Sequence, residues 1–78
     1  MTDEIKRQVM IESLSALSIE DFKKYLDFHN EMYGFKTFKE VLDYDMVCYQ
    51  GIGDELDPSQ FRKMMDHDNK VLIEEYCD

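Results

Sequence analysis

The chain has few residues that break helices and no apolar run long enough to cross a membrane. Its 78 residues include 3 glycines, 1 proline and no tryptophan. A membrane-spanning helix needs roughly 20 consecutive apolar residues. The first residues are acidic (Met1, Thr2, Asp3, Glu4), whereas a signal peptide begins with basic residues. These absences predict a cytoplasmic protein that does not bind membranes.

Cysteine and basic residues are also scarce. Cys48 and Cys77 are the two cysteines, fewer than a small secreted protein uses for a disulfide framework, so we expect free thiols. There are 9 Lys and Arg residues against 18 Asp and Glu residues, which gives a net charge of −9. The bases form isolated pairs such as Lys6–Arg7, whereas phosphate binding needs a cluster. Direct binding to nucleic acid is therefore not expected.

The apolar content is that of a folded protein. Hydrophobic residues make up 44% of the chain, including 5 Phe, 5 Tyr and 6 Met. An acidic disordered segment has few such residues. A chain of this length buries about 60% of its unfolded surface, which is enough for one small core. We expect a single domain that spans residues 1–78.

Helix signals predict an all-α fold of four to five short helices. Side chains that cap helix starts precede four apolar periodic stretches, at Thr2, Ser18, Thr37 and Asp57. The first helix is expected to end near residue 16. Gly34 is expected to end the second helix in a left-handed conformation.

The second helix has the clearest apolar stripe. Phe22, Leu26 and Tyr33 recur at helical spacing, and we expect all three to be buried. His29 lies on the same stripe. No nucleophile or glycine-rich loop accompanies it, so a histidine at the edge of the core is favoured over a catalytic one.

Two segments allow alternatives. Residues 38–50 are apolar on more than one face and favour a helix, although residues 46–50 also suit a short strand. Residues 58–76 form either one helix or two. The run from Asp66 to Asn69 resembles a break with a new cap, and one continuous helix turns Asp68 inward.

The acid is unevenly distributed along the chain. Residues 1–40 contain 8 acids and 6 bases, a balance of −2, whereas residues 41–78 contain 10 acids and 3 bases, a balance of −7. Such asymmetry bears on partners and solubility and does not determine the fold. The acid-rich second half is therefore the candidate binding surface.

Metal and catalytic chemistry have little support. Asp66, His67 and Asp68 cluster ligand types, but no paired spacing of a zinc site is present. The segment that begins at Asp43 lacks the glycine and the glutamate of a calcium loop. Neighbouring carboxylates on a short helical protein usually form a solvated face. We expect no cofactor, no metal and no enzymatic activity.

The composition favours a small acidic binding protein that inhibits or modulates a basic partner. Its carboxylates are expected to occupy the phosphate-binding surface of a nucleic-acid-processing or host-defence protein, as a DNA mimic does, and small acidic phage inhibitors are broadly similar in size and charge. The expected contacts are carboxylates with a few apolar anchors. They are Asp43, Asp45, Tyr49, Ile52, Asp54, Glu55, Asp57, Met65, Asp66 and Asp68.

Two other classes of protein remain open. One is a helical interaction or dimerisation module, including a homodimer, whose acid only keeps the protein in solution. The other is a metal-dependent or catalytic domain, for which no reaction type is indicated. A phage origin, which implies the host cytoplasm, is suggested by composition alone.

Overall fold

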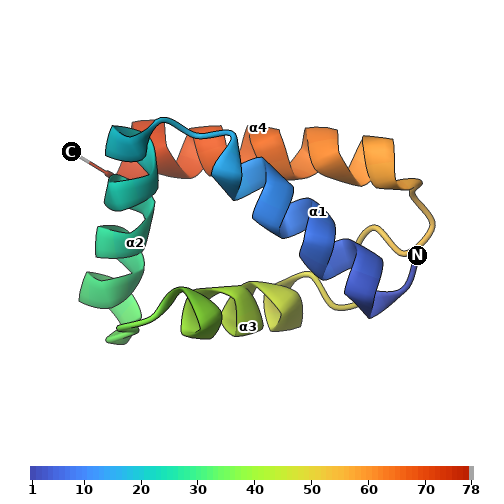
Figure 1. Ribbon diagram of the computed structural model, residues 1–78, viewed down its shortest axis with the longest axis horizontal. Coiled ribbons are helices and arrows are strands. Elements are labelled where there is room, and N and C mark those ends of the chain that lie inside the picture. Colours follow the sequence, from blue (N-terminus) through green and yellow to red (C-terminus); the bar gives the residue numbers. More distant parts are fainter. Residues whose placement is uncertain (78) are drawn as a thin grey trace.

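The computed structural model describes residues 1–77 and contains four helices (Figure 1). The fold is all-α, as predicted from the sequence. The helices are α1 (Asp3–Ser15), α2 (Ile19–Tyr33), α3 (Phe38–Cys48) and α4 (Pro58–Tyr76).

The predicted capping residues begin the helices. Thr2 and Ser18 accept hydrogen bonds from backbone N–H groups in the first turns of α1 and α2. Thr37 and Asp57 form complete capping boxes with Glu40 and Gln60. Gly34 ends α2 with a φ of 74°, the left-handed conformation that glycine adopts without strain.

The helices form an elongated molecule of 33 × 20 × 18 Å. In Figure 1, α4 and α3 run along opposite sides, α2 stands across one end, and α1 runs diagonally between them. The N-terminus and the α3–α4 loop lie together at the other end. The two ends of the molecule are therefore built from different parts of the chain.

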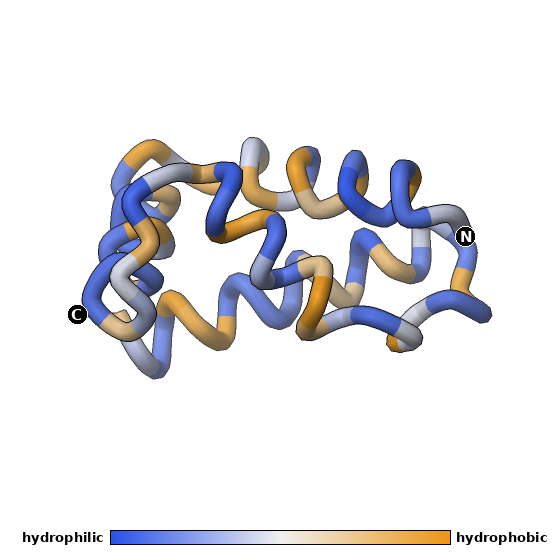
Figure 2. The backbone as a smooth tube through the Cα atoms, turned by 90° about the horizontal axis from the view of Figure 1, so that it is seen from below, coloured by the Kyte–Doolittle hydropathy of each residue, from blue (hydrophilic) through white to orange (hydrophobic). Residues whose placement is uncertain are grey.

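The core lies where α1 crosses α3 and α4. Hydrophobic residues recur along each helix with hydrophilic residues between them, so every helix has an apolar side (Figure 2). Phe61 and Met10 are completely buried. The other members of the core cluster are Val9, Leu14, Tyr25, Val41, Leu42 and Met65.

The apolar stripe of α2 is placed differently from the prediction. Its buried residues are Tyr25 and His29. Phe22 and Leu26 are half-buried and pack against the core, whereas Tyr33 is 44% exposed, so the expected burial is found in part for Phe22 and Leu26 and is wrong for Tyr33. The helix crosses only the end of the core, and the row that contains Tyr25 and His29 is the one that faces it.

The two ambiguous segments are both settled as helix. α3 ends at Cys48 and a turn follows, so no strand forms in the described residues 46–50. α4 is continuous, so of the two alternatives left open for residues 58–76 the single helix is the one that forms. Asn69 is buried and its amide donates to Ser13 of α1 at 3.0 Å, so this polar run packs against α1 as part of a helix.

Two further features of residues 1–77 are the state of the cysteines and the apolar character of the helices. Cys48 and Cys77 do not form a disulfide with each other. Among residues 1–77, no helix combines the length and the apolar character that crossing a membrane requires.

Candidate partner-binding surface

A buried lysine holds the α3–α4 loop in place. Lys6 is only 1% exposed, although lysine is rarely buried. Its ammonium group has three N–H donors, and three oxygens accept them: the carbonyls of Tyr49 and Ile52 at 3.0 and 3.2 Å, and Oδ1 of Asp54 at 2.7 Å. The ring of Phe61 lies 5.8 Å below the same nitrogen.

Lys6 therefore replaces the cation that the end of α3 lacks. α3 has no basic residue in its last turn, and Tyr49 is its C-cap. The ammonium group of Lys6 bonds to the carbonyl oxygen of this cap and stabilises the negative end of the helix. The hydrogen bond from Lys6 also lowers the pKa of the Asp54 carboxyl group.

Carboxylates surround this pinned loop, and we call them the loop-end surface. They are Asp3, Glu4, Asp54, Glu55 and Asp57, and all five residues are exposed. The first turn of α1 lies beside the loop because Lys6 binds Asp54 and the Met1 amino group donates to the Asp54 carbonyl at 3.2 Å. Ile52, a predicted apolar anchor, is 50% exposed on the same loop.

Two other predicted binding residues face internal cations. Asp43 accepts hydrogen bonds from Lys39 and Arg7, which lower the pKa of its carboxyl group. Asp66 accepts from Ser13 at 2.5 Å and from Arg62 at 2.9 Å.

Burial disfavours the ionised form of Asp66, but the hydrogen bonds from Ser13 and Arg62 outweigh it, and its pKa is lowered. Asp43 and Asp66 thus join α3 and α4 to α1. Their negative charge is already compensated within the molecule.

Asp45 and Met65 were predicted to contact a partner, and both predictions were wrong. Met65 is 2% exposed and belongs to the core. Asp45 is 6% exposed and accepts a hydrogen bond from the hydroxyl of the buried Tyr25. Both residues lie on the inner faces of their helices, where the helical period places them with Phe61 and Val41.

His29 completes a buried polar cluster with Tyr25 and Asp45. Its Nδ1 lies 2.9 Å from the Tyr25 carbonyl oxygen, and its Nε2 lies 3.8 Å from Asp45. Burial lowers the pKa of His29, but the carboxylate of Asp45 and the Tyr25 carbonyl outweigh this effect and raise it overall. The same burial, with the adjacent Asp45, raises the pKa of Tyr25. The cluster connects α2 to α3.

Tyr49 and Asp68 bind each other. The hydroxyl of Tyr49 donates to Oδ2 of Asp68 at 2.7 Å and links the end of α3 to α4. Burial, together with this hydrogen bond, raises the pKa of Tyr49. The inward turn of Asp68 thus accompanies the continuous helix, as the sequence implied. Both side chains are half-buried, so little of either is left for a partner.

Of the ten predicted contact residues, Ile52, Asp54, Glu55 and Asp57 come together on one exposed segment. Sequence reasoning missed Asp3 and Glu4, which the fold brings beside them. It also missed Lys6, although a signal was present. Lys6 precedes the buried Val9 and Met10 by three and four residues, which is the spacing of the apolar stripe.

In residues 1–77, no group of three or more His, Cys, Asp or Glu side chains is arranged to hold an ion. No protein-family model matches the chain, and neither the curated proteins nor the solved structures contain a significant match to it.

Proposed function

We propose that this protein is a small acidic binding protein that inhibits or modulates a basic partner by occupying its phosphate-binding surface. The observation that carries the proposal is the loop-end surface. It gathers five exposed carboxylates from α1 and the α3–α4 loop around a buried lysine. Lys6 has its three donors engaged beneath the loop, so the carboxylates are the groups that face solvent there.

Rigidity supports this reading. The loop is fixed by Lys6, and Asp57 is fixed as the N-cap of α4. The carboxylates of Asp54 and Asp57 are thereby held in place and lose little conformational entropy on binding. Duplex DNA carries one negative charge per roughly 1.7 Å, and a basic groove that is built for it attracts any ordered array of negative charges.

Within residues 1–77, the test changes acids that accept no hydrogen bond from another helix or from the loop. The triple variant Asp3→Asn, Glu4→Gln, Glu55→Gln removes three negative charges from the loop-end surface. The control variant Glu12→Gln, Glu20→Gln, Asp21→Asn removes three charges elsewhere. Each variant and the wild type capture proteins from an extract of the native host, and the captured proteins are quantified by mass spectrometry.

A specific partner is expected to be retained by the wild type and the control, to be lost with the loop-end variant, and to be displaced by duplex DNA. Its retention is also expected to fall steeply as salt rises, because exposed charges are screened over about 8–10 Å at physiological ionic strength. Equal retention by both triple variants, or indifference to DNA, contradicts the proposal.

The alternative function is a helical interaction or dimerisation module. Its support is a set of exposed apolar side chains: Ile19, Met32, Val47 and Tyr76 are 90%, 61%, 69% and 66% exposed. These residues lie on three different helices. Sedimentation velocity across a concentration series tests this function directly. A dimer that persists at low concentration and is lost on mutation of one of these residues favours the alternative.

A further inference from the structure

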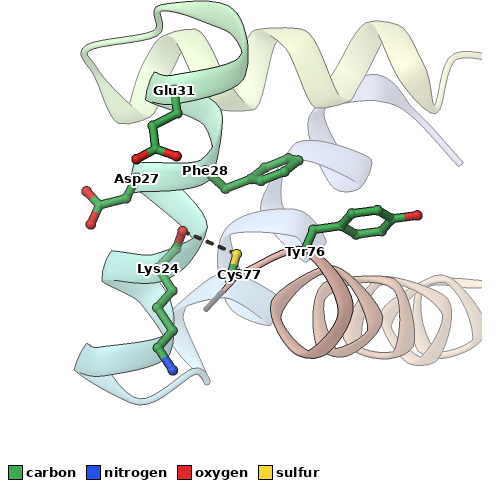
Figure 3. A pocket seen from close by; sticks show the side chains of 6 residues that line it. All are labelled: Lys24, Asp27, Phe28, Glu31, Tyr76 and Cys77. Atoms are coloured by element: carbon green, nitrogen blue, oxygen red, sulfur yellow. Dashed lines mark hydrogen bonds between the residues drawn. The ribbon is translucent and has the colours of Figure 1, made fainter.

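A groove of about 270 Å³ lies between α2 and the end of α4, at the opposite end of the molecule from the loop-end surface. Its lining residues are Lys24, Asp27, Phe28, Glu31, Tyr76 and Cys77 (Figure 3). The aromatic rings of this groove extend away from its carboxylates in this view. The acids of the groove face solvent, whereas the rings lead to the buried cluster of Tyr25, His29 and Asp45.

Aromatic rings surround the buried side chain of His29. The ring of Phe28 packs against it edge-on with 5.5 Å between centroids, and Tyr76 of α4 lies 6.1 Å from Phe28. The rings of Tyr33 and Tyr44 lie 5.8 and 6.3 Å from His29. A charge in such surroundings is costly unless a partner compensates it.

The backbone of α2 decides which nitrogen of His29 always carries a hydrogen. Nδ1 lies 2.9 Å from the carbonyl oxygen of Tyr25, one turn earlier in the helix. A carbonyl oxygen only accepts, so Nδ1 donates and keeps its hydrogen. Nε2 is therefore the nitrogen that gains or loses a proton, and it lies 3.8 Å from Oδ1 of Asp45.

Asp45 depends on this nitrogen for a positive charge. The carboxylate is buried, and its other oxygen accepts from the hydroxyl of Tyr25. Among residues 1–77, no lysine or arginine pairs with Asp45, and His29 is its one cationic partner. With a proton on Nε2, His29 and Asp45 form an ion pair. Without that proton, a nitrogen lone pair faces a buried carboxylate, which is unfavourable.

The other titratable groups around the cluster do not replace this positive charge. Tyr33 and Tyr44 are phenols, which ordinarily ionise near pH 10 and then become anions. Hydrogen bonds with Tyr33 and Cys48 raise the pKa of Tyr44. On α4, Asp68 is itself an acid and accepts a hydrogen bond from α3. The positive charge of the cluster therefore depends on His29.

The polar cluster carries much of the contact between α2 and α3. A second groove, of about 260 Å³, lies between these helices and is lined by Leu26 and Asn30 from α2 and by Phe38 and Val41 from α3. The helices are therefore not closely packed along their whole contact. The two buried residues of α2 both belong to the polar cluster.

We propose that His29 is a pH-dependent switch that holds α2 against α3. With a proton on Nε2, the ion pair with Asp45 keeps the two helices together. When the proton leaves, water enters to solvate the Asp45 carboxylate, the end of α2 moves away from α3, and the rings of Tyr33 and Tyr44 become exposed. The switch is separate from the loop-end surface, so either proposal can fail while the other stands.

The direction of the switch follows from the raised pKa of His29. A raised pKa in the folded state means that the contribution of the ion pair is fully present below the unfolded value and is lost as pH rises through the folded value. The closed form is therefore the form at lower pH, and the open form appears above the midpoint of His29.

The test follows the wild-type protein by NMR through a pH series. Long-range nitrogen–proton spectra of the imidazole rings report the tautomer and the midpoint of each histidine, and the chain contains 2 histidines. We expect His29 to keep its hydrogen on Nδ1 and to titrate above the ordinary value of about 6.5. Amide hydrogen exchange, corrected for intrinsic rates, is then measured well below and well above that midpoint.

The exchange measurement distinguishes local opening from global unfolding. Above the midpoint, protection in residues 29–33 and 44–48 is expected to fall about tenfold, because a hydrogen bond to a charged group is replaced by a weaker contact. Exchange of these amides is expected to depend little on urea, since little surface is exposed in a local opening. Buried amides of α1 are expected to exchange only with the full urea dependence of global unfolding.

Two variants sharpen the assignment. Asp45→Asn removes the negative charge and keeps an acceptor for the hydroxyl of Tyr25. It should lower the midpoint of His29 to the ordinary value or below and abolish the pH response of residues 29–33 and 44–48. His67→Gln, which changes the exposed histidine of α4, is the matched control and should leave both unchanged. If Asp45→Asn does not fold, the wild-type pH series decides.

Three results overturn the proposal. One is a neutral His29 with its hydrogen on Nε2, because no lone pair then faces Asp45. Another is exchange in residues 29–33 and 44–48 that does not rise across the midpoint, or that has the same urea dependence as exchange in α1. The third is an unchanged pH response in a folded Asp45→Asn variant.

Discussion

The two ends of the molecule use acidic residues in opposite ways. At the loop end, Asp54 pairs with the buried Lys6, Asp57 caps α4, and Asp3 and Glu4 lie in the first turn of α1. Each of these positions stabilises a helix or the loop, because anions are favourable at helix N-termini. At the groove end, Glu31 lies in the last turn of α2, which contains no basic residue, and no cation among residues 1–77 pairs with it.

This difference separates the carboxylates whose positions stabilise the fold from those whose positions do not. Acid at the loop end contributes to stability and is also available to a partner. Acid in the groove opposes the helix dipole and therefore needs another reason to be there. The predictions below test this contrast, from the largest expected effect to the smallest.

The largest effect is expected from Lys6→Met at the loop end. The variant keeps an apolar stem of similar length but leaves the carbonyls of Tyr49 and Ile52 and the carboxylate of Asp54 without their donor. A loss of about 3 kcal/mol is expected in the free energy of unfolding, measured with urea. A loss below about 1 kcal/mol shows that the loop is not held by Lys6.

The second effect is the pH dependence of stability, to which His29 and Asp54 should contribute in opposite directions. His29 has a raised pKa in the folded state, so its contribution is fully present below its unfolded value and is lost as pH rises through the folded value. Asp54 has a lowered pKa, so its contribution is present above its unfolded value and is lost as pH falls through the folded value.

We therefore expect urea midpoints to decline as pH rises above about 6.5, the ordinary pKa of histidine, through weakening of the Tyr25–His29–Asp45 cluster. Asp45→Asn should remove this decline while leaving the acid limb of the profile in place. A decline of the same size in the variant shows that another group is responsible.

A smaller loss is expected from Asp57→Ala, which removes the N-cap of α4. The side chain of Asp57 accepts from the backbone N–H of Gln60 at 2.8 Å. Loss of such a cap costs about 1 kcal/mol. Asp57→Asn keeps an acceptor and should lose much less, as judged by thermal unfolding of the two variants in parallel. Equal losses attribute the effect to charge and not to capping.

The smallest change is a gain, expected from Glu31→Lys at the groove end. A cation in the last turn of α2 and four residues after Asp27 is favourable on both counts, and the sum is about 0.5 kcal/mol. Asp21→Lys, at the start of the same helix, is the matched control and should lose stability. If Glu31→Lys destabilises the protein, the account of the groove charge is wrong.

The helices could be predicted from the sequence because their signals are local. Thr37 with Glu40 and Asp57 with Gln60 lie three residues apart, and Gly34 needs only its own conformation. The continuity of α4 was harder to predict. Asn69 is an unfavourable residue in an isolated helix, but its bond to Ser13, 56 residues away, is formed only in the folded structure.

The candidate surface was predicted less well, because the contacts that decide it also join residues far apart in the sequence. Asp43, Asp45 and Asp54 look alike in the sequence, yet one binds Lys39 and Arg7, one is buried against Tyr25 and one binds Lys6. Which cation reaches which carboxylate depends on how the helices cross. The groove brings together two segments far apart in the sequence, so it left no local signal.

The central claim is that a basic partner contacts the exposed carboxylates at the two ends of the molecule. It does not contact Asp43 and Asp66, which are paired with cations between the ends. An NMR titration of the labelled protein with an arginine–glycine repeat peptide, at about 50 mM and about 300 mM salt, tests this directly. The account predicts shifts at residues 3–4, 52–57 and 27–31 that weaken at the higher salt. Shifts centred on Asp43 and Asp66, or spread evenly over all the acids, contradict it.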